Sequence, residues 1–226
     1  MFSPSITINI FLMFAINCIY FSIYGVWCKC RVNKKSTKNL HINIDDLYFK
    51  KVKSIYGEII RYAATAQNDL KLTKKQNNII TEIKIANRKM VEIIKDVKDL
   101  NKNVSMSLNI ENKYLSKEYD NFRKKLTKVL RAIYLFRTEE NTEKYAAKLA
   151  NIKKEAKDNI RQSNKSIDKL IRKNLITVQM ASSLFNDYSN VNDIIKKLIE
   201  VAELLYGSTD TLFGNGNFID EKKSAN

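Results

Sequence analysis

The stretch LSKEYDNFRKKLTKVLRAIYLF, residues 115 to 136, decides the fold class of this chain. Its apolar side chains recur at alternating intervals of four and three residues, and they are Leu115, Tyr119, Phe122, Leu126, Val129, Ile133 and Phe136. Residues with this spacing lie on one face of an α-helix. The stretch therefore predicts a long amphipathic helix that buries its apolar face against other helices.

The same helical spacing is repeated on both sides of this stretch. It covers about residues 52 to 66, 83 to 108, 145 to 170 and 180 to 205. Proline is absent after Pro4, and Gly57 is the only glycine between Asn33 and Tyr206, so residues that interrupt helices are scarce. A chain of 226 residues is long enough to bury a substantial core. We therefore predict an all-α fold, an antiparallel bundle of about five long helices over residues 45 to 207.

Polar residues interrupt the apolar faces at two places. Asn87 and Asn101 fall on the apolar face of residues 83 to 108, where a polar side chain fixes register at a cost in stability. Near the start of the last helix, which Thr177 is expected to cap, small polar residues adjoin the apolar face. They are Ser182, Ser183, Asn186 and Asp187. We expect them to bond to neighbouring backbone or side chains and to fix how the last helix docks.

The chain begins with an apolar segment that predicts a transmembrane anchor, residues 1 to 28. No charged residue precedes Lys29, and residues 6 to 28 are long enough to cross the hydrocarbon core as a helix. A signal peptide would carry a basic start and a small-residue cleavage site, and neither flanks this segment. We therefore expect the anchor to be uncleaved, giving a single-pass protein of the cell inner membrane.

Basic residues immediately after the anchor predict its orientation. Residues 29 to 44 form a basic juxtamembrane linker, with cations at Lys29, Arg31, Lys34, Lys35 and Lys38. The positive-inside rule then places the N-terminus outside and the bundle in the cytoplasm. The same cations are attracted to anionic headgroups. At the other end, residues 208 to 226 show no helical period and are expected to form a flexible tail.

The net charge of +16 is compatible with nucleic acid, an anionic membrane or a solvated basic surface. The basic residues are spread over every predicted helix, and no groove-reading motif or aromatic platform accompanies them. We therefore predict no specific nucleic-acid partner. The three cysteines lie in or beside the apolar segment and are expected to be reduced.

The sequence offers little for catalysis. His41 is the single histidine and lies in the linker, the predicted bundle has no cysteine, and no glycine-rich phosphate loop or zinc spacing occurs. We therefore expect no enzymatic activity and no organic cofactor. Glu92 and Asp96 lie four residues apart on one helix face, where two carboxylates could share a divalent metal or iron. Because Lys95 and Lys98 lie beside them, a solvated surface pair is the alternative interpretation.

Three separated segments of the chain carry motifs of a known kind. They are DVKDLNKNV, residues 96 to 104, EYDNFRKKLTKVLRAIYLFR, residues 118 to 137, and ITVQMASSLFNDYSNVNDIIKKLIEVAELLY, residues 176 to 206. Within the last segment, the motif residues are Ala181, Ser182, Ser183, Leu184, Asn186 and Asp187. In this order the three segments resemble the PhoU-like domain at the cytoplasmic C-terminus of bacterial sodium/phosphate symporters. The resemblance covers about residues 45 to 206 and implies a PhoU-like helical bundle.

The chain also departs from that family. A symporter has many membrane helices, whereas this chain has one predicted membrane segment. PhoU proteins carry paired ExxxD metal motifs, whereas here only Glu92 with Asp96 has that spacing. The resemblance implies a membrane-anchored regulatory or accessory module linked to phosphate uptake, which docks on a membrane phosphate transporter or sensor. A variant is the detached C-terminal part of a split symporter. The alternative is a membrane-anchored helical scaffold, unrelated to phosphate, whose bundle mediates self-association or lipid contact.

Overall fold

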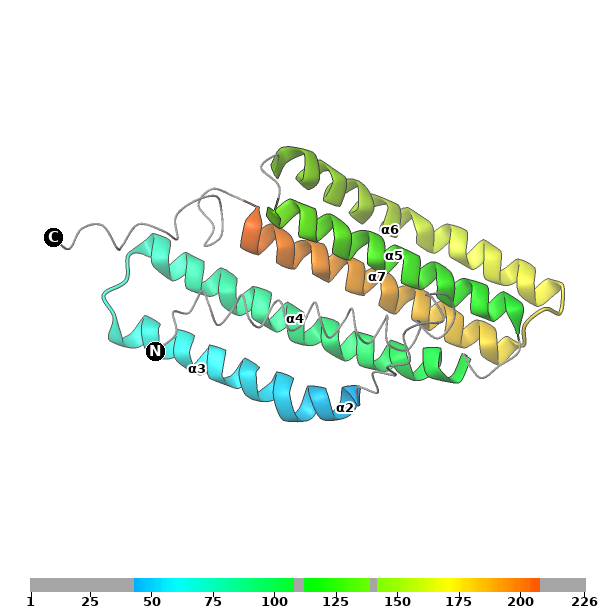
Figure 1. The fold of residues 1–226 in the computed structure, drawn as a ribbon, viewed down its shortest axis with the longest axis horizontal. Helices are drawn as coiled ribbons and strands as arrows, with labels where there is room; N and C mark the ends of the chain where they lie inside the picture. The colour runs from blue at the N-terminus through cyan, green and yellow to red at the C-terminus, as the bar shows by residue number, and fades with distance from the viewer. Residues whose placement is uncertain (1–42, 108–111, 139–141, 208–226) are drawn as a thin grey trace, which may run out of the picture.

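The structure is a computed structural model that describes residues 43 to 107, 112 to 138 and 142 to 207. The described residues are mainly helical and contain no strand (Figure 1). The predicted anchor at residues 1 to 28, the linker up to residue 42 and the predicted tail at residues 208 to 226 lie outside the described residues. Within the described part, no helix combines the length and the apolar character that a membrane crossing requires. The anchor therefore stays a prediction.

The predicted bundle of about five long helices is confirmed. A short helix α2, a π-helical segment η1 and α3 follow one another without a break, and α4 to α7 come after them along the chain. Their bounds are α2 (Ile44–Asp46), η1 (Leu47–Val52), α3 (Lys53–Asp69), α4 (Lys74–Ser107), α5 (Lys113–Thr138), α6 (Thr142–Arg172) and α7 (Val178–Tyr206). Successive long helices alternate in direction, so α5 and α7 run parallel to each other (Figure 1).

Side-chain caps define the helix starts. Thr73 and Gln76 form a reciprocal capping box before α4, in which each side chain accepts from the backbone N–H of the other residue, at 3.2 and 2.9 Å. The side chain of Asn112 accepts two backbone N–H groups at the start of α5. Thr177 caps α7 through the N–H of Met180 at 3.2 Å, which confirms the predicted cap.

A left-handed residue makes the turn between α6 and α7. Asn174 has a φ of 53°, a conformation in which asparagine is enriched, and the N–H of Leu175 bonds back to the carbonyl of Leu170 at 3.0 Å. This arrangement closes α6 and reverses the chain, so that α7 packs back along α6.

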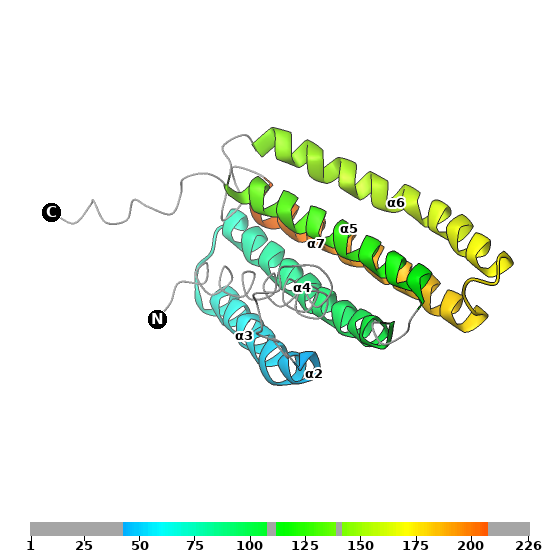
Figure 2. The ribbon, with the colours of Figure 1, turned by 45° about the vertical axis from the view of Figure 1, so that its right-hand side comes forward.

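Helix α7 lies at the centre of the fold. It packs on α4 on one side and on α5 and α6 on the other, whereas α3 packs on α4 at the edge (Figures 1 and 2). Most of the α7 surface is therefore buried, and fully buried side chains such as Leu184 and Ile194 stabilise the fold by about 1.5 to 3 kcal/mol each. Among the described residues, the main helix contact of α3 is with α4, and Tyr62 of α3 is 48% exposed.

Candidate functional site in the bundle interior

Asp187, on α7, places a carboxylate in the interior of the bundle. The residue is fully buried, and it accepts hydrogen bonds from two other helices. Asn103 Nδ2, on α4, donates to Asp187 Oδ1 at 2.9 Å, and Tyr119 OH, on α5, donates to Asp187 Oδ2 at 2.7 Å. Both carboxylate oxygens are thus paired, which a buried polar group requires. Asp187 therefore joins α7 to α4 and α5.

The next residue along α7 makes a second set of interior bonds. Tyr188 OH donates to the buried carboxylate of Glu118 on α5, and Ser163 on α6 hydrogen-bonds to the same tyrosine oxygen. Together the two sets include polar side chains from α4, α5, α6 and α7. We call Asn103, Glu118, Tyr119, Ser163, Asp187 and Tyr188 the interior polar network.

An aromatic ring separates the two tyrosines of the interior polar network. Phe122 is fully buried and makes edge-to-face contacts with Tyr119 and with Tyr188, at centroid distances of 5.5 and 4.5 Å. Such contacts contribute about 0.5 to 1.5 kcal/mol beyond their buried area. Lys125 Nζ lies 5.1 Å from the centre of the Tyr188 ring, within cation–π range. The ring thus helps to set the directions of both hydroxyl groups.

Burial sets the protonation of the interior polar network. Burial, with the bonds to Asp187 and Glu118, raises the pKa of Tyr119 and of Tyr188 far above their usual range, so both hydroxyls stay protonated and donate. Burial also raises the pKa of Asp187, although the bonds from Tyr119 and Asn103 oppose the rise. Burial lowers the pKa of Lys125, which the charge of Glu118 partly offsets. The interior polar network therefore consists of bonds that hold the helices together and orient them.

The pH dependence of stability should report the state of Asp187. Its folded pKa lies above the unfolded value of about 3.9, so its contribution to stability falls as pH rises from that value through the folded pKa. We therefore expect the difference in unfolding free energy between wild type and Asp187→Asn to grow in favour of wild type as pH falls from 7 towards 4. Urea unfolding across this range measures it, and a pH-independent difference would contradict the expectation. The other carboxylates titrate in both the wild type and the variant, so their contributions cancel in the difference.

The four polar residues predicted near the start of α7 separate in the structure. Asp187 points into the interior, whereas Ser182 and Asn186 are exposed and Ser183 is partly buried. The expected side-chain bonds to neighbouring helices are found for Asp187. Ser182 and Asn186 lie four residues apart on α7 and form an exposed strip that an external partner can reach.

The predicted metal pair, Glu92 and Asp96, faces α7 and has a lysine between its carboxylates. Lys197 Nζ lies 2.7 Å from Asp96 Oδ2 and 3.8 Å from Glu92 Oε2, while Arg88 also pairs with Glu92. Burial raises the pKa of Asp96, although the hydrogen bond from Lys197 opposes the rise. Among the described residues, no three His, Cys, Asp or Glu side chains come together as metal ligands. A cation at Glu92 and Asp96 would have to displace the ammonium group, and this site stays a prediction.

Lys197 connects α7 to α4 through its contacts with Asp96 and Glu92. Replacing Lys197 with methionine keeps most of its length but removes the cation from Asp96 and Glu92. We expect a loss of about 1 kcal/mol in the free energy of unfolding, because the pair is about one-quarter exposed and charged hydrogen bonds at such sites have modest net value. Urea unfolding measures this. Lys196→Met on the adjacent exposed position is the matched control, and an equal effect of both variants would contradict the assignment.

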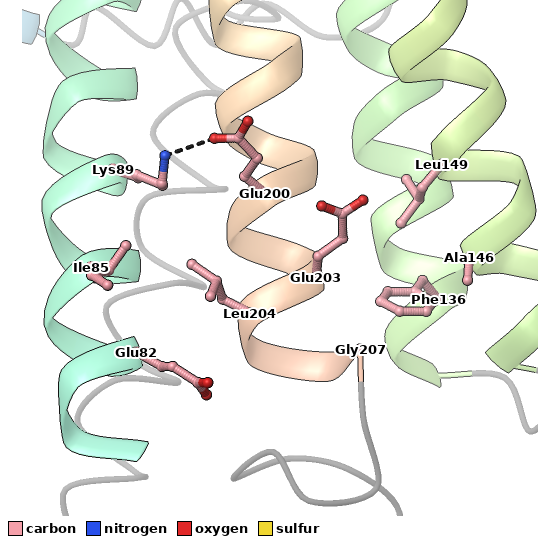
Figure 3. A pocket seen from close by; sticks show the side chains of 10 residues that line it. All are labelled: Glu82, Ile85, Lys89, Phe136, Ala146, Leu149, Glu200, Glu203, Leu204 and Gly207. Atoms are coloured by element: carbon pink, nitrogen blue, oxygen red, sulfur yellow. Dashed lines mark hydrogen bonds and ion pairs between the residues drawn. The ribbon is translucent and has the colours of Figure 1, made fainter. Parts of the chain in front are cut away.

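A groove lies beside the C-terminal end of α7 (Figure 3). It has a volume of about 610 Å³, with α7 in the middle, α4 on one side and the adjoining ends of α5 and α6 on the other. Its lining residues are Glu82, Ile85, Lys89, Phe136, Ala146, Leu149, Glu200, Glu203, Leu204 and Gly207. Lys89 Nζ and Glu200 Oε2 bridge α4 and α7 across it at 2.7 Å. Burial would raise the pKa of Glu200, but the charges of Lys89 and Lys153 hold it below its usual range.

Sequence reasoning found Asp187 but missed the rest of the interior polar network. Tyr119, Tyr188 and Ser163 fall at the helical spacing of the predicted apolar faces, and their hydroxyl groups were the available signal that polar bonds run through those faces. Asn103 lies two residues after Asn101, and Asn101 is the residue that the sequence predicts as polar on the apolar face of residues 83 to 108. Asn87, the other residue expected there, is fully buried, and its amide atoms find no hydrogen-bond partner within the described residues.

Comparisons with known proteins leave the family open. No protein-family model matches the sequence, and the searches of curated proteins and of solved structures found no match either. The arguments about function therefore rest on the residues and on their arrangement.

Proposed function

We propose that this chain is a regulatory or accessory module of phosphate uptake, which docks on a membrane phosphate transporter or sensor from the cytoplasmic side. The proposal rests on the resemblance of residues 176 to 206 of the bundle to a PhoU-like domain. One observation supports it above the others. Asp187 and Leu184 of the matching segment are buried and bind α7 to its neighbours, whereas Ser182 and Asn186 of the same segment are exposed.

This division suggests a conformational mechanism. The buried members fix the position of α7, and the exposed members present a polar strip to a partner. Because the interior polar network joins four helices, a partner that moves α7 would alter bonds to α4, α5 and α6 together. Signal transfer by helix movement needs no catalytic group, which agrees with the expectation that the chain is not an enzyme.

Co-purification from detergent-solubilised membranes tests the proposal. We expect a multi-span phosphate carrier to co-purify with the chain, and Asn186→Arg to reduce its recovery because the exposed strip then carries an extra bulky charge. Asn164→Arg, the same change at an exposed position of α6, is the matched control. Recovery of no phosphate carrier, together with unchanged phosphate uptake after deletion of the gene, would contradict the proposal.

The split-symporter variant makes a separate genetic prediction. A transport domain that ends just short of its last helix would be encoded next to this gene. The two chains would then assemble into one carrier, and phosphate uptake would need both. Uptake that persists with the neighbouring chain alone would exclude this variant.

Exposed apolar side chains at the edge helix favour a second candidate function, a self-associating scaffold. Phe49 in η1 and Tyr62 in α3 are 56% and 48% exposed, and a second copy of the chain that covered them would bury apolar surface. Light scattering of the purified chain distinguishes this function. An oligomer that dissociates on Tyr62→Ser, with phosphate uptake unchanged on deletion, would favour the scaffold.

A further inference from the structure

The exposed charges of α5 all have the same sign. Every exposed charged residue of this helix is basic, and these residues are Lys113, Lys117, Lys124, Lys128, Arg131 and Arg137. The two acidic residues of α5 are not exposed. Glu118 is buried and accepts from Tyr188, whereas Asp120 is partly buried. Asp120 pairs with Arg123 and Lys124, at 2.7 and 3.4 Å. The exposed side of α5 is therefore uniformly positive.

Helical spacing places most of these cations in one strip, and α6 extends the strip. From Lys113 to Arg131 they follow one another at intervals of 4, 7, 4 and 3 residues, so they lie on the same side of α5.

Helix α6 packs beside α5 (Figures 1 and 2), and Lys128 Nζ pairs with Glu155 Oε2 of α6 at 2.7 Å in an exposed position. Lys148 and Lys169 are exposed and lie seven residues before and fourteen residues after Glu155, on the same side of α6. We call Lys148, Lys169 and the cations from Lys113 to Arg131 the basic face.

The basic face is not a simple consequence of a lysine-rich composition. The segment from α2 to α3 also exposes many charges, but four of them are basic and four are acidic. Helix α7 exposes Lys196 together with Asp193 and Glu203. Charge is therefore balanced on these parts of the surface and strongly positive on the exposed side of α5. A surface of one sign attracts a partner of the opposite sign, so the basic face indicates an anionic partner.

The residue types of the basic face favour one kind of anionic partner. Specific recognition of nucleic acid relies on arginine, whose planar group forms bidentate bonds. The basic face instead has lysine at every position except Arg131, and the lysine ammonium group is a point charge that attracts lipid headgroups without a fixed geometry. A second copy of the chain would bring like charges together, which is repulsive. The basic face therefore fits an anionic lipid surface.

The dimensions of the bundle allow this contact. The strip from Lys113 to Arg131 is about 27 Å long and straight, so it can lie flat on a bilayer. The predicted anchor ends at residue 28, and residues 29 to 42 reach at most about 50 Å when extended. This reach exceeds the length of α5, which is about 39 Å. The predicted linker therefore lets any side of the bundle approach the bilayer, and charge selects the side.

We propose that the basic face docks on anionic lipid headgroups, so that α5 and α6 lie against the membrane surface. The attraction is electrostatic and reversible, because the lysines are exposed and keep their charge in water. This inference goes beyond the proposed function and needs no link to phosphate uptake.

Lysine acylation of the full chain in lipid nanodiscs tests the docking. We compare discs of phosphatidylcholine with discs that also contain phosphatidylglycerol, and a water-soluble succinimidyl ester reports how accessible each lysine is. In the anionic discs we expect Lys117, Lys148 and Lys169 to react at least about fivefold more slowly, because headgroups cover them. Raising the salt to about 1 M, where the Debye length is about 3 Å, should abolish the difference. Equal rates in the two kinds of disc would overturn the proposal.

Lysines away from the basic face provide the internal reference. Lys51 in η1 and Lys74 and Lys95 in α4 are exposed, and their acylation rates should agree within about twofold between the two kinds of disc. An equal slowing of these lysines would show general attraction of a basic protein, and it would overturn the assignment to α5 and α6.

A matched pair of variants tests whether the basic face causes the protection. Lys117→Gln/Lys148→Gln/Lys169→Gln removes three cations, each worth about a factor of five in attraction, so docking should weaken on the order of 100-fold. Acylation of the remaining Lys124 in anionic discs should then return to its rate in phosphatidylcholine discs.

The control variant, Lys51→Gln/Lys74→Gln/Lys95→Gln, has the same net charge and should keep Lys124 protected. All six positions are exposed, and helical circular dichroism checks that both variants fold as the wild type does. Equal loss of protection in the two variants would contradict a specific docking face.

An RNA arm distinguishes the lipid surface from nucleic acid. A single-stranded RNA is added to the chain in phosphatidylcholine discs at physiological salt, and acylation is measured again. We expect the lysines of the basic face to keep their rates. Protection by RNA without protection by anionic lipid would replace the membrane with nucleic acid as the partner and would overturn the proposal.

Discussion

Replacing Asp187 with alanine is expected to lower the free energy of unfolding by about 2 to 4 kcal/mol. The alanine removes the acceptor of Tyr119 OH and of Asn103 Nδ2, which then lie in the interior without their partner. A buried donor that loses its acceptor costs about 1 to 3 kcal/mol, and two donors are affected here. The gain from no longer burying a carboxylate offsets part of this loss.

Thermal and urea unfolding followed by helical circular dichroism measure this effect. A domain of this size loses about 2 to 4 °C of melting temperature per kcal/mol, so a decrease of roughly 4 to 16 °C is expected. Asn186→Ala, at the exposed neighbouring position, is the matched control and should change stability by less than about 0.5 kcal/mol. A shift for Asp187→Ala as small as that of the control would contradict the structural role of the buried carboxylate.

A double-mutant cycle isolates the bond between Tyr119 and Asp187. Tyr119→Phe keeps the ring and its contact with Phe122 but removes the hydroxyl that donates to Asp187. If the two groups act through this bond, the double variant should be less destabilised than the sum of the single variants, by about 1 to 2 kcal/mol. An additive result would assign the effect of Asp187→Ala to Asn103 or to lost packing.

The helices and most of the core could be predicted from the sequence because their signal is local. All seven apolar positions of residues 115 to 136 are buried as expected, since a single helix needs no knowledge of its neighbours to define its apolar face. Thr177 was recognisable as a cap for the same reason, because its hydroxyl bonds three residues along the chain. Local patterns therefore gave the elements and the faces that they bury.

The partners of Asp187 could not be predicted, because they depend on how far each helix is shifted along the others. Tyr119 is 68 residues away from Asp187 in sequence, and Asn103 is 84 residues away. A shift of one helix by a single turn, about 5.4 Å, would replace both partners. The same limitation applies to Asp96, whose partner Lys197 lies on a different helix and was not among the lysines considered beside it.

Replacing Phe122 with alanine is expected to have the largest effect, a loss of about 3 to 5 kcal/mol in the free energy of unfolding. The side chain is fully buried, and its loss leaves a cavity between α5 and α7. It also removes the edge-to-face contacts with Tyr119 and Tyr188, whose hydroxyls bind the two interior carboxylates. Urea unfolding measures the loss, and Tyr134→Ala on the exposed side of α5 is the control, with little expected change.

A leucine at position 122 separates the volume of the ring from its orienting role. If Phe122 only fills space, Phe122→Leu should recover most of the stability and cost less than about 1.5 kcal/mol. If the ring also holds the two tyrosines in place, the coupling energy between Tyr119 and Asp187 should fall in the leucine background. That coupling is obtained by repeating the double-mutant cycle with leucine at position 122. An unchanged coupling energy would show that the interior polar network keeps its geometry without the aromatic ring, and Phe122 would then be a packing residue alone.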